Sequence, residues 1–180
     1  MKTLWISTFL LLMTGPLGLA ETNWSQWRGA TGNGLSTAAD VPQKFSGKDV
    51  IWKTELPGVG QSSPVFWEDT VYLTSATDNG VKRLVLAVKR KTGEIKWQTL
   101  VWTGEAEDTH AMNNRASSTC ATDGTSVVAF FGKGGLHSLD AKTGQIIWSR
   151  DLGKFEGPWG TGASPVIVDG LVVQNCDADN

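Results

Sequence analysis

A nine-residue pattern that occurs twice constrains the fold of this chain more than any other feature. Residues 140–148 read Asp-Ala-Lys-Thr-Gly-Gln-Ile-Ile-Trp, and residues 89–97 read Lys-Arg-Lys-Thr-Gly-Glu-Ile-Lys-Trp. In each copy an apolar run enters a polar turn that Thr-Gly closes, and a Trp follows on the returning segment. Because Gly adopts positive φ at no steric cost, the pattern predicts a β-hairpin with a type I turn and a bulge. We therefore expect a repeat protein.

A third Trp extends the repeat toward the N-terminus. Residues 50–56 match the segment that begins at Trp148, so Trp52 is predicted to lie in the last strand of a blade. The other strands of that blade do not precede it in the sequence. A large aromatic ring at one fixed place in each unit favours a packing role. The predicted structural docking residues are Trp52, Trp97, Trp148, Gly93 and Gly144.

A second marker recurs in step with the Trp residues. Ser63-Pro64-Val65 returns as Ser164-Pro165-Val166 and, more loosely, as Ser118-Thr119-Cys120. An acid follows each copy, begins a polar turn and precedes a β-rich run. These acids are Glu68, Asp123 and Asp169.

Each unit is therefore expected to contain four short strands. The predicted strands are 63–67, 70–76, 83–89 and 94–101, then 117–122, 126–131, 136–140 and 145–150, and finally 164–168 and 171–176. Four antiparallel strands in roughly 45–50 residues is the period of a β-propeller blade, and helical periodicity is nearly absent beyond the N-terminal segment. The predicted fold is an all-β propeller of four-stranded antiparallel blades. Its expected divisions are a ring-closing strand at 50–56, blades at 57–102 and 103–152, and a half blade at 153–180.

These markers resemble the quinoprotein-type (PQQ-like) β-propeller repeat family. That family includes the pyrroloquinoline quinone (PQQ) dehydrogenases and BamB, a non-catalytic outer-membrane assembly factor. The resemblance rests on the Thr-Gly and Trp pattern, the small residues Ala87 and Ser138 upstream of it, and Trp-x-Gln-Trp-Arg-Gly at residues 24–29. It implies seven or eight blades, of which about two and a half are present, so we expect an N-terminal fragment. The first copy departs from the pattern, since Lys89 replaces the acid Asp140 and removes a predicted turn cap.

The N-terminus carries an expected export signal. Residues 1–20 combine Lys2, an apolar run over residues 4–13 and the small residues Gly18 and Ala20, as in a secretory signal peptide. Residues 21–49 would then form an arm and connector, and the protein would be periplasmic or extracellular. The formal net charge of −2 with scattered bases disfavours a nucleic-acid partner, and no later run is long and apolar enough for a transmembrane segment.

Two loops hold the residues with the best prospects for ligand binding. The loop at residues 103–116 is rich in acids and amides, and the segment at 157–162 combines glycines with an indole. The predicted cofactor-binding residues are Asn113, Arg115 and Trp159, with carboxylate and amide oxygens suited to calcium and an indole suited to a flat quinone. The alternatives are a solvated connector and a tight turn between blades. The last four residues, Asp177–Asn180, lack the spacing of a calcium loop.

The sequence assigns no catalytic residue and no metal site. It contains no adjacent Cys pair, no Cys-x-x-Cys-His motif and no Ser-His-acid set that can be assembled. Cys120 and Cys176 either pair in an oxidising compartment or remain free thiols. The leading hypothesis is a non-catalytic binding or assembly scaffold with a protein or small-molecule ligand at the propeller face. The alternative is a PQQ- and calcium-dependent quinoprotein dehydrogenase that oxidises an alcohol or a sugar, with the cofactor left undetermined.

Overall fold

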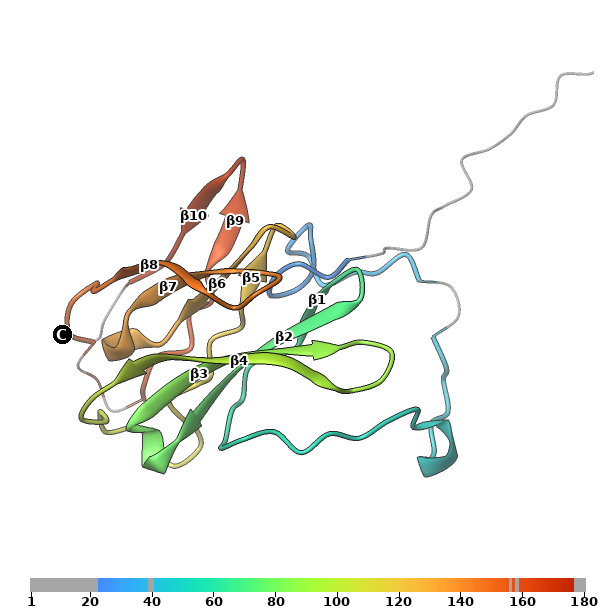
Figure 1. The fold of residues 1–180 in the computed structure, drawn as a ribbon, viewed down its shortest axis with the longest axis horizontal. Helices are drawn as coiled ribbons and strands as arrows, with labels where there is room; N and C mark the ends of the chain where they lie inside the picture. The colour runs from blue at the N-terminus through green and yellow to red at the C-terminus, as the bar shows by residue number, and fades with distance from the viewer. Residues whose placement is uncertain (1–22, 39–40, 156, 158, 177–180) are drawn as a thin grey trace, which may run out of the picture.

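Two four-stranded antiparallel sheets and the start of a third form the structure (Figure 1), a computed structural model that describes residues 23–38, 41–155, 157 and 159–176. The first sheet has the order β1 (Val65–Trp67), β2 (Thr70–Thr77), β3 (Lys82–Lys89) and β4 (Ile95–Thr103). The second has β5 (Ala121–Thr122), β6 (Ser126–Phe130), β7 (Leu136–Asp140) and β8 (Ile146–Arg150), and the third has β9 (Val166–Val168) and β10 (Leu171–Val173). The described residues also form three short 3-10 helices: η1 (Gly47–Asp49) before β1, η2 (Asp78–Gly80) between β2 and β3, and η3 (Gly132–Gly134) between β6 and β7. The predicted all-β propeller fold with four-stranded blades is confirmed.

The two copies of the repeated hairpin differ in how their turns are held. The Asp140 carboxylate accepts hydrogen bonds from the backbone N–H of Lys142 and Thr143 at 3.0 and 2.7 Å, and these bonds lower its pKa together with the Thr143 hydroxyl. In the first copy Lys89 instead forms an ion pair with Glu94 at 2.6 Å. Both hairpins contain the expected register shift, so the bulge is conserved although the side-chain cap is not.

The small residue upstream of each turn lies directly beside the Trp. Ala87 is fully buried and pairs with Trp97 on one side and Tyr72 on the other, and the two rings lie 5.9 Å apart across it. Ser138 pairs with Trp148 in the same way. A larger side chain in this row would occupy the space that the rings fill.

Trp97 joins the first sheet to the second. Its indole Nε1 donates a hydrogen bond to the Ala141 carbonyl at 3.2 Å, and the Tyr72 hydroxyl donates to the same oxygen at 3.2 Å. The Thr99 hydroxyl donates to the Gly144 carbonyl at 2.7 Å. Gly144 has φ +73, and a Cβ there would lie 2.6 Å from the Trp97 ring. The turn therefore needs glycine for its backbone and for its contact with the indole.

Trp52 makes the equivalent contacts one unit earlier. Its Nε1 donates to the Arg90 carbonyl at 2.8 Å, the Thr54 hydroxyl donates to the Gly93 carbonyl at 2.6 Å, and a Cβ on Gly93 would lie 2.5 Å from the indole. The structure nevertheless has no strand over residues 50–56, contrary to the sequence expectation. Within the described ranges no strand runs beside this segment to share a hydrogen-bond ladder, so its side chains hold it in place. Its role in ring closure stays a prediction.

The inner-strand marker is displaced by one residue in the second unit. Val65 and Ala121 each pair with a residue of the second strand of their sheet. That residue lies in the same cross-strand row as the docking Trp of the sheet, so Ala121 is the equivalent of Val65. Two positions earlier, Thr119 therefore corresponds to Ser63, and the predicted match of Ser118 with Ser63 is wrong.

The cause of this displacement is the turn that follows the inner strand. Glu68 and Asp169 both have φ +50, and Gly124, with φ +85, takes this left-handed position in the second unit. Asp123 lies one residue earlier, and its carboxylate accepts from the N–H of Thr125 at 2.9 Å. The sequence comparison thus matched Asp123 with Glu68 and Asp169 because all three are acids, although Gly124 is the residue with the equivalent backbone conformation.

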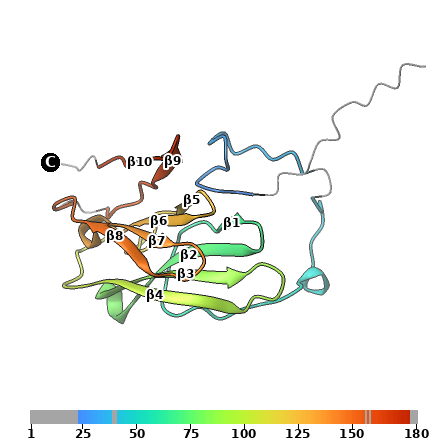
Figure 2. The ribbon, with the colours of Figure 1, turned by 45° about the horizontal axis from the view of Figure 1, so that its top comes forward.

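The N-terminal arm crosses the inner strands of all three units, and Figure 2 shows it in blue beside β1, β5 and β9. Trp24 and Phe66 exchange two backbone hydrogen bonds of 2.9 Å. The Ser25 carbonyl then accepts from Thr122 N–H at 2.8 Å, and the Gln26 side chain accepts from Ile167 N–H at 3.3 Å. These contacts satisfy backbone groups on inner strand edges that otherwise lack a neighbour.

The predicted signal peptide at residues 1–20 and the acidic end at residues 177–180 lie outside the described residues. Among the residues that were placed, no helix has the length and apolar character needed to cross a membrane.

Replacing Gly144 with Ala should destabilise the protein more than the same change at Gly170. Both glycines have nearly equal φ, +73 and +74, so each variant carries the same left-handed strain of about 1–2 kcal/mol. Only Gly144 contacts an indole, whereas a Cβ on Gly170 meets no atom within 4 Å. We expect Gly144→Ala to lower the free energy of unfolding by a further ~1–3 kcal/mol in urea titrations. Equal losses in the two variants would contradict the docking role of Trp97.

Candidate functional site

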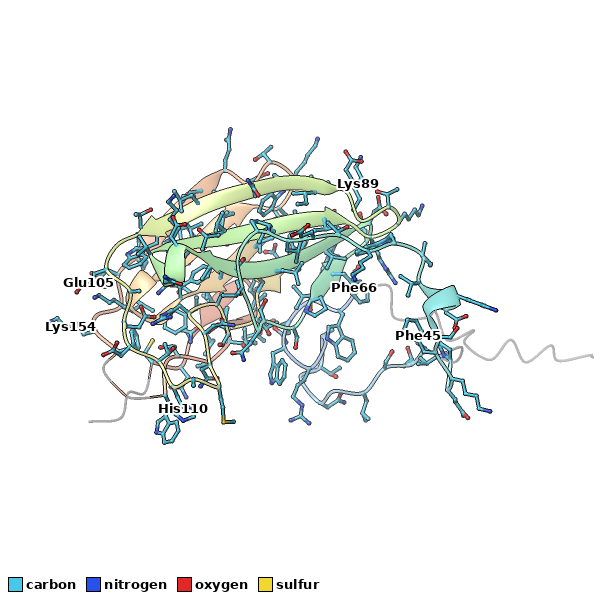
Figure 3. All side chains as sticks on the ribbon, turned by 90° about the horizontal axis from the view of Figure 1, so that it is seen from below. Phe45, Phe66, Lys89, Glu105, His110 and Lys154 are labelled. Carbon is cyan, nitrogen blue, oxygen red and sulfur yellow. The ribbon has the colours of Figure 1, made fainter. Side chains whose placement is uncertain are left out.

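The two loops predicted to bind a ligand meet in the structure. Asn113 Nδ2 donates a hydrogen bond to the Trp159 carbonyl at 2.6 Å, and the rings of His110 and Trp159 lie 5.0 Å apart at an interplanar angle of 41°. A Cβ on Gly160 would lie 3.0 Å from the Thr109 side chain, so glycine permits the close approach of the backbones. Figure 3 shows His110 at the edge of its loop, projecting away from the sheets.

This contact leaves an exposed aromatic surface. The Trp159 side chain is 56% exposed and neighbouring Met112 is 76% exposed. His110 Nδ1 accepts from the Met112 N–H at 3.2 Å, which fixes the ring beside the indole. We call His110, Met112 and Trp159 the Trp159 surface.

Arg115 does not join the other two predicted cofactor-binding residues. Its Nε and Nη2 both donate to the Glu107 carbonyl, at 3.0 and 2.9 Å. The guanidinium therefore closes the loop on itself, while Asn113 and Trp159 are brought together. Sequence reasoning grouped the three residues by loop and had no means of assigning their directions.

A buried ion pair that the sequence analysis missed anchors the loop. Arg83 Nη2 lies 2.7 Å from Glu107 Oε2, and the exposed fractions of the two side chains are 0% and 14%. The guanidinium carbon lies 5.1 Å from the Trp102 ring centroid. Burial lowers the pKa of Arg83, and the Glu107 carboxylate opposes that shift. Within the described part of the chain Arg83 Nε and Nη1 have no hydrogen-bond partner, so the carboxylate is the group that compensates this charge.

Gln61 holds the opposite end of the same loop. Its Nε2 donates to the Met112 carbonyl at 2.8 Å, and its Oε1 accepts from the Asn114 N–H at 3.0 Å and the Ser117 hydroxyl at 3.1 Å. Both anchors come from the first unit, so the first unit determines where the loop of the second lies.

His137 is a buried histidine with defined hydrogen bonds. Its Nε2 lies 2.7 Å from the Gly134 carbonyl, which can only accept, so Nε2 carries the proton. Nδ1 then accepts from the Ser149 hydroxyl at 2.9 Å. Burial lowers the pKa of His137 and outweighs the opposing bond to Gly134, so the neutral ring is favoured.

The two cysteines are free thiols, and the pairing that the sequence left open does not occur. Cys120 is buried in the core, which raises its pKa to about 12, whereas Cys176 is exposed. Among the described residues no group of three or more His, Cys, Asp or Glu side chains is placed to hold a metal ion.

Comparisons with known proteins give one family and two similar structures. The sequence model of a family described as "Outer membrane protein assembly factor BamB" matches residues 15–174. A europium-containing methanol dehydrogenase has a TM-score of 0.46 and 19% identity, over 67% of this chain and 21% of its own. BamB from Moraxella catarrhalis has a TM-score of 0.46 and 20% identity, over 69% of this chain and 33% of its own. The chain thus spans between a fifth and a third of these two structures, and no curated protein matches it.

Replacing Glu107 with Gln should destabilise the protein by about 2–4 kcal/mol, because it leaves the Arg83 charge buried without a counter-charge. Glu105→Gln is the matched control, since its side chain is 92% exposed and its ion pair with Lys133 is 3.9 Å long. The control should lose less than about 1 kcal/mol. Urea unfolding of both variants measures the difference, and similar losses would show that the Glu107 charge does not anchor the loop.

The buried His137 should make the protein less stable at mildly acidic pH. The unfolded chain takes up a proton below about pH 6.5, whereas the folded ring, with its lowered pKa, resists protonation until lower pH. Stability contributed by the neutral ring is therefore present above pH 6.5 and lost as the pH falls. We expect His137→Gln to show a smaller drop in unfolding free energy between pH 7.5 and 5.5 than the natural protein. An identical drop in both would contradict this assignment.

Proposed function

This chain belongs to the family described as outer membrane protein assembly factor BamB, and from that premise we propose that it is a non-catalytic scaffold that binds a protein partner through the Trp159 surface. The proposal includes export to the periplasm or the outside of the cell. The export part rests on the apolar N-terminal pattern of residues 1–20 and on the family.

The observation that carries this proposal is the internal use of the loop's polar groups. Arg115 is bound to the Glu107 backbone, the Glu107 carboxylate is paired with Arg83, and the Asn113 amide holds the Trp159 backbone. Polar groups that are already hydrogen-bonded within the protein stabilise the surface of the loop and are not arranged to receive a small charged ligand. A preformed surface of this kind loses little conformational entropy when a partner binds.

The exposed side chains of this surface suit a protein partner. Half-exposed Trp159 and exposed Met112 offer apolar area next to a histidine ring. Aromatic residues and methionine are enriched at protein interfaces, and residues such as Trp carry a large share of the binding energy.

The rival is a PQQ- and calcium-dependent dehydrogenase that oxidises an alcohol or a sugar. The half-exposed Trp159 indole favours it, because such a ring could stack on a quinone. The remaining residues fit the cofactor poorly, since Arg115 and Glu107 already satisfy groups within the loop and His110 covers part of the indole. We therefore assign the chain no step in such a reaction.

Titration with PQQ separates the two functions. We expect the full-length natural protein, supplied with calcium, to show no saturable PQQ binding at micromolar concentrations by calorimetry and no dye-linked alcohol or sugar oxidation. One-to-one binding accompanied by oxidation would establish the dehydrogenase and exclude the scaffold.

Site-specific crosslinking tests the partner surface directly. A photo-crosslinking amino acid at position 159, introduced in the native host, should give one discrete protein adduct. The same amino acid at Lys142, an exposed position on the β7–β8 turn, serves as the control and should give none. Adducts of equal yield at both positions, or none at 159, would contradict the proposal.

A further inference from the structure

A pocket of about 400 Å³ lies where the N-terminal arm meets the segments that lead into the three inner strands. Its walls come from one arm residue and from all three units, and none of Asn113, Arg115 or Trp159 belongs to it. The lining residues are Trp27, Gln61, Ser63, Ser117, Thr119, Gly162, Ala163 and Ser164.

The pocket presents one hydroxyl residue from the same structural position of each unit. These residues are Ser63, Thr119 and Ser164, and they are linked from unit to unit. Ser63 N–H donates to the Thr119 hydroxyl oxygen at 3.0 Å, and Thr119 N–H donates to the Ser164 hydroxyl oxygen at 3.0 Å. The row is therefore fixed in space by backbone groups.

These hydroxyls keep hydrogen-bonding capacity for another molecule. A hydroxyl has one donor and two acceptor positions, and in Thr119 and Ser164 only acceptor capacity is used. The Ser63 hydroxyl has no hydrogen-bond partner among the residues that the structure describes. Thr119 is only 2% exposed, so the hydroxyls within reach of a ligand are those of the half-buried Ser63 and Ser164. Two hydroxyls in a fixed row match a ligand that carries several hydroxyl oxygens.

The rest of the lining selects for a neutral ligand with an apolar face. Trp27 is 52% exposed and supplies a flat indole. None of the described residues that line the pocket is charged, so they offer nothing to compensate the desolvation of a phosphate, a carboxylate or an ammonium group. Sugar rings combine an apolar face with neutral hydroxyls.

We propose that this pocket is a carbohydrate-binding site, with a neutral pyranose ring stacked on Trp27 and its hydroxyls bonded to Ser63 and Ser164, which the buried Thr119 holds in a row. The site goes beyond the scaffold function and shares no residue with the Trp159 surface, although Gln61 contacts both. A protein that fails to bind a partner at Trp159 can still bind sugar here, so the two proposals fail separately.

Calorimetric titration of the full-length natural protein with maltotriose and cellotriose tests the site. At least one trisaccharide should bind saturably. Trp27→Ala should weaken this binding by at least about tenfold, because the indole supplies the apolar stacking surface. Trp159→Ala, the matched control with a similarly exposed indole, should leave the affinity within about twofold. Glucose, glucosamine and glucuronate share the pyranose ring and are neutral, positively charged and negatively charged, and the neutral sugar should bind best.

Ser63→Ala provides a second variant that does not depend on the arm. It removes a hydroxyl without a described partner and retains the Ser63 N–H that bonds to Thr119, so the fold should be preserved. Its affinity for the same trisaccharide should fall about threefold to tenfold, as expected for one hydrogen bond. Absence of trisaccharide binding at millimolar concentration, affinities unchanged by both pocket variants, or tighter binding of glucuronate than glucose would overturn the proposal.

Discussion

An indole that lies on a glycine turn of the next unit is the contact on which the arrangement of the sheets depends. The Trp97 indole donates to the Ala141 carbonyl and the Trp52 indole to the Arg90 carbonyl. Beside each indole a threonine hydroxyl, of Thr99 or Thr54, donates to the carbonyl of the turn glycine. The turn must lack a Cβ for two reasons, its left-handed backbone and the closeness of the ring. Because each four-stranded sheet has a Trp on its fourth strand and such a turn between its third and fourth strands, one contact type can join successive units.

The inner strands are joined by a different set of interactions. Hydroxyl residues accept backbone hydrogen bonds from the preceding unit, and the N-terminal arm crosses the strand edges of all three units. The outer contacts are formed by a large ring, whereas the backbone hydrogen bonds between the inner segments are accepted by the small hydroxyl side chains of Thr119 and Ser164. This difference leaves room for a pocket at the inside and places an extended loop at one end of the sheets.

Tertiary contacts account for what sequence reasoning missed. The Arg83–Glu107 pair joins a strand to a loop 24 residues later, and neither residue belongs to a repeated motif. Residues 50–56 carry a strand-like pattern, but a strand also needs a neighbour, which this segment lacks in the described structure. Thr119 was missed because Asp123 was matched by residue type, although a glycine, Gly124, occupies the left-handed position of that turn.

The sequence by itself determined most of the strands, their order and the contacts of Trp52 and Trp97 with a turn, because hairpins form between neighbours in the chain and their turns need particular residues such as Gly93 and Gly144. It also located the two loops that meet at Trp159. Only the tertiary structure decided that Asn113 holds Trp159 while Arg115 turns back to its own loop. Side-chain directions in loops depend on partners that are distant in sequence. The row of hydroxyl residues in the pocket with Trp27 also depends on contacts distant in sequence, since each of the three units contributes one of its members.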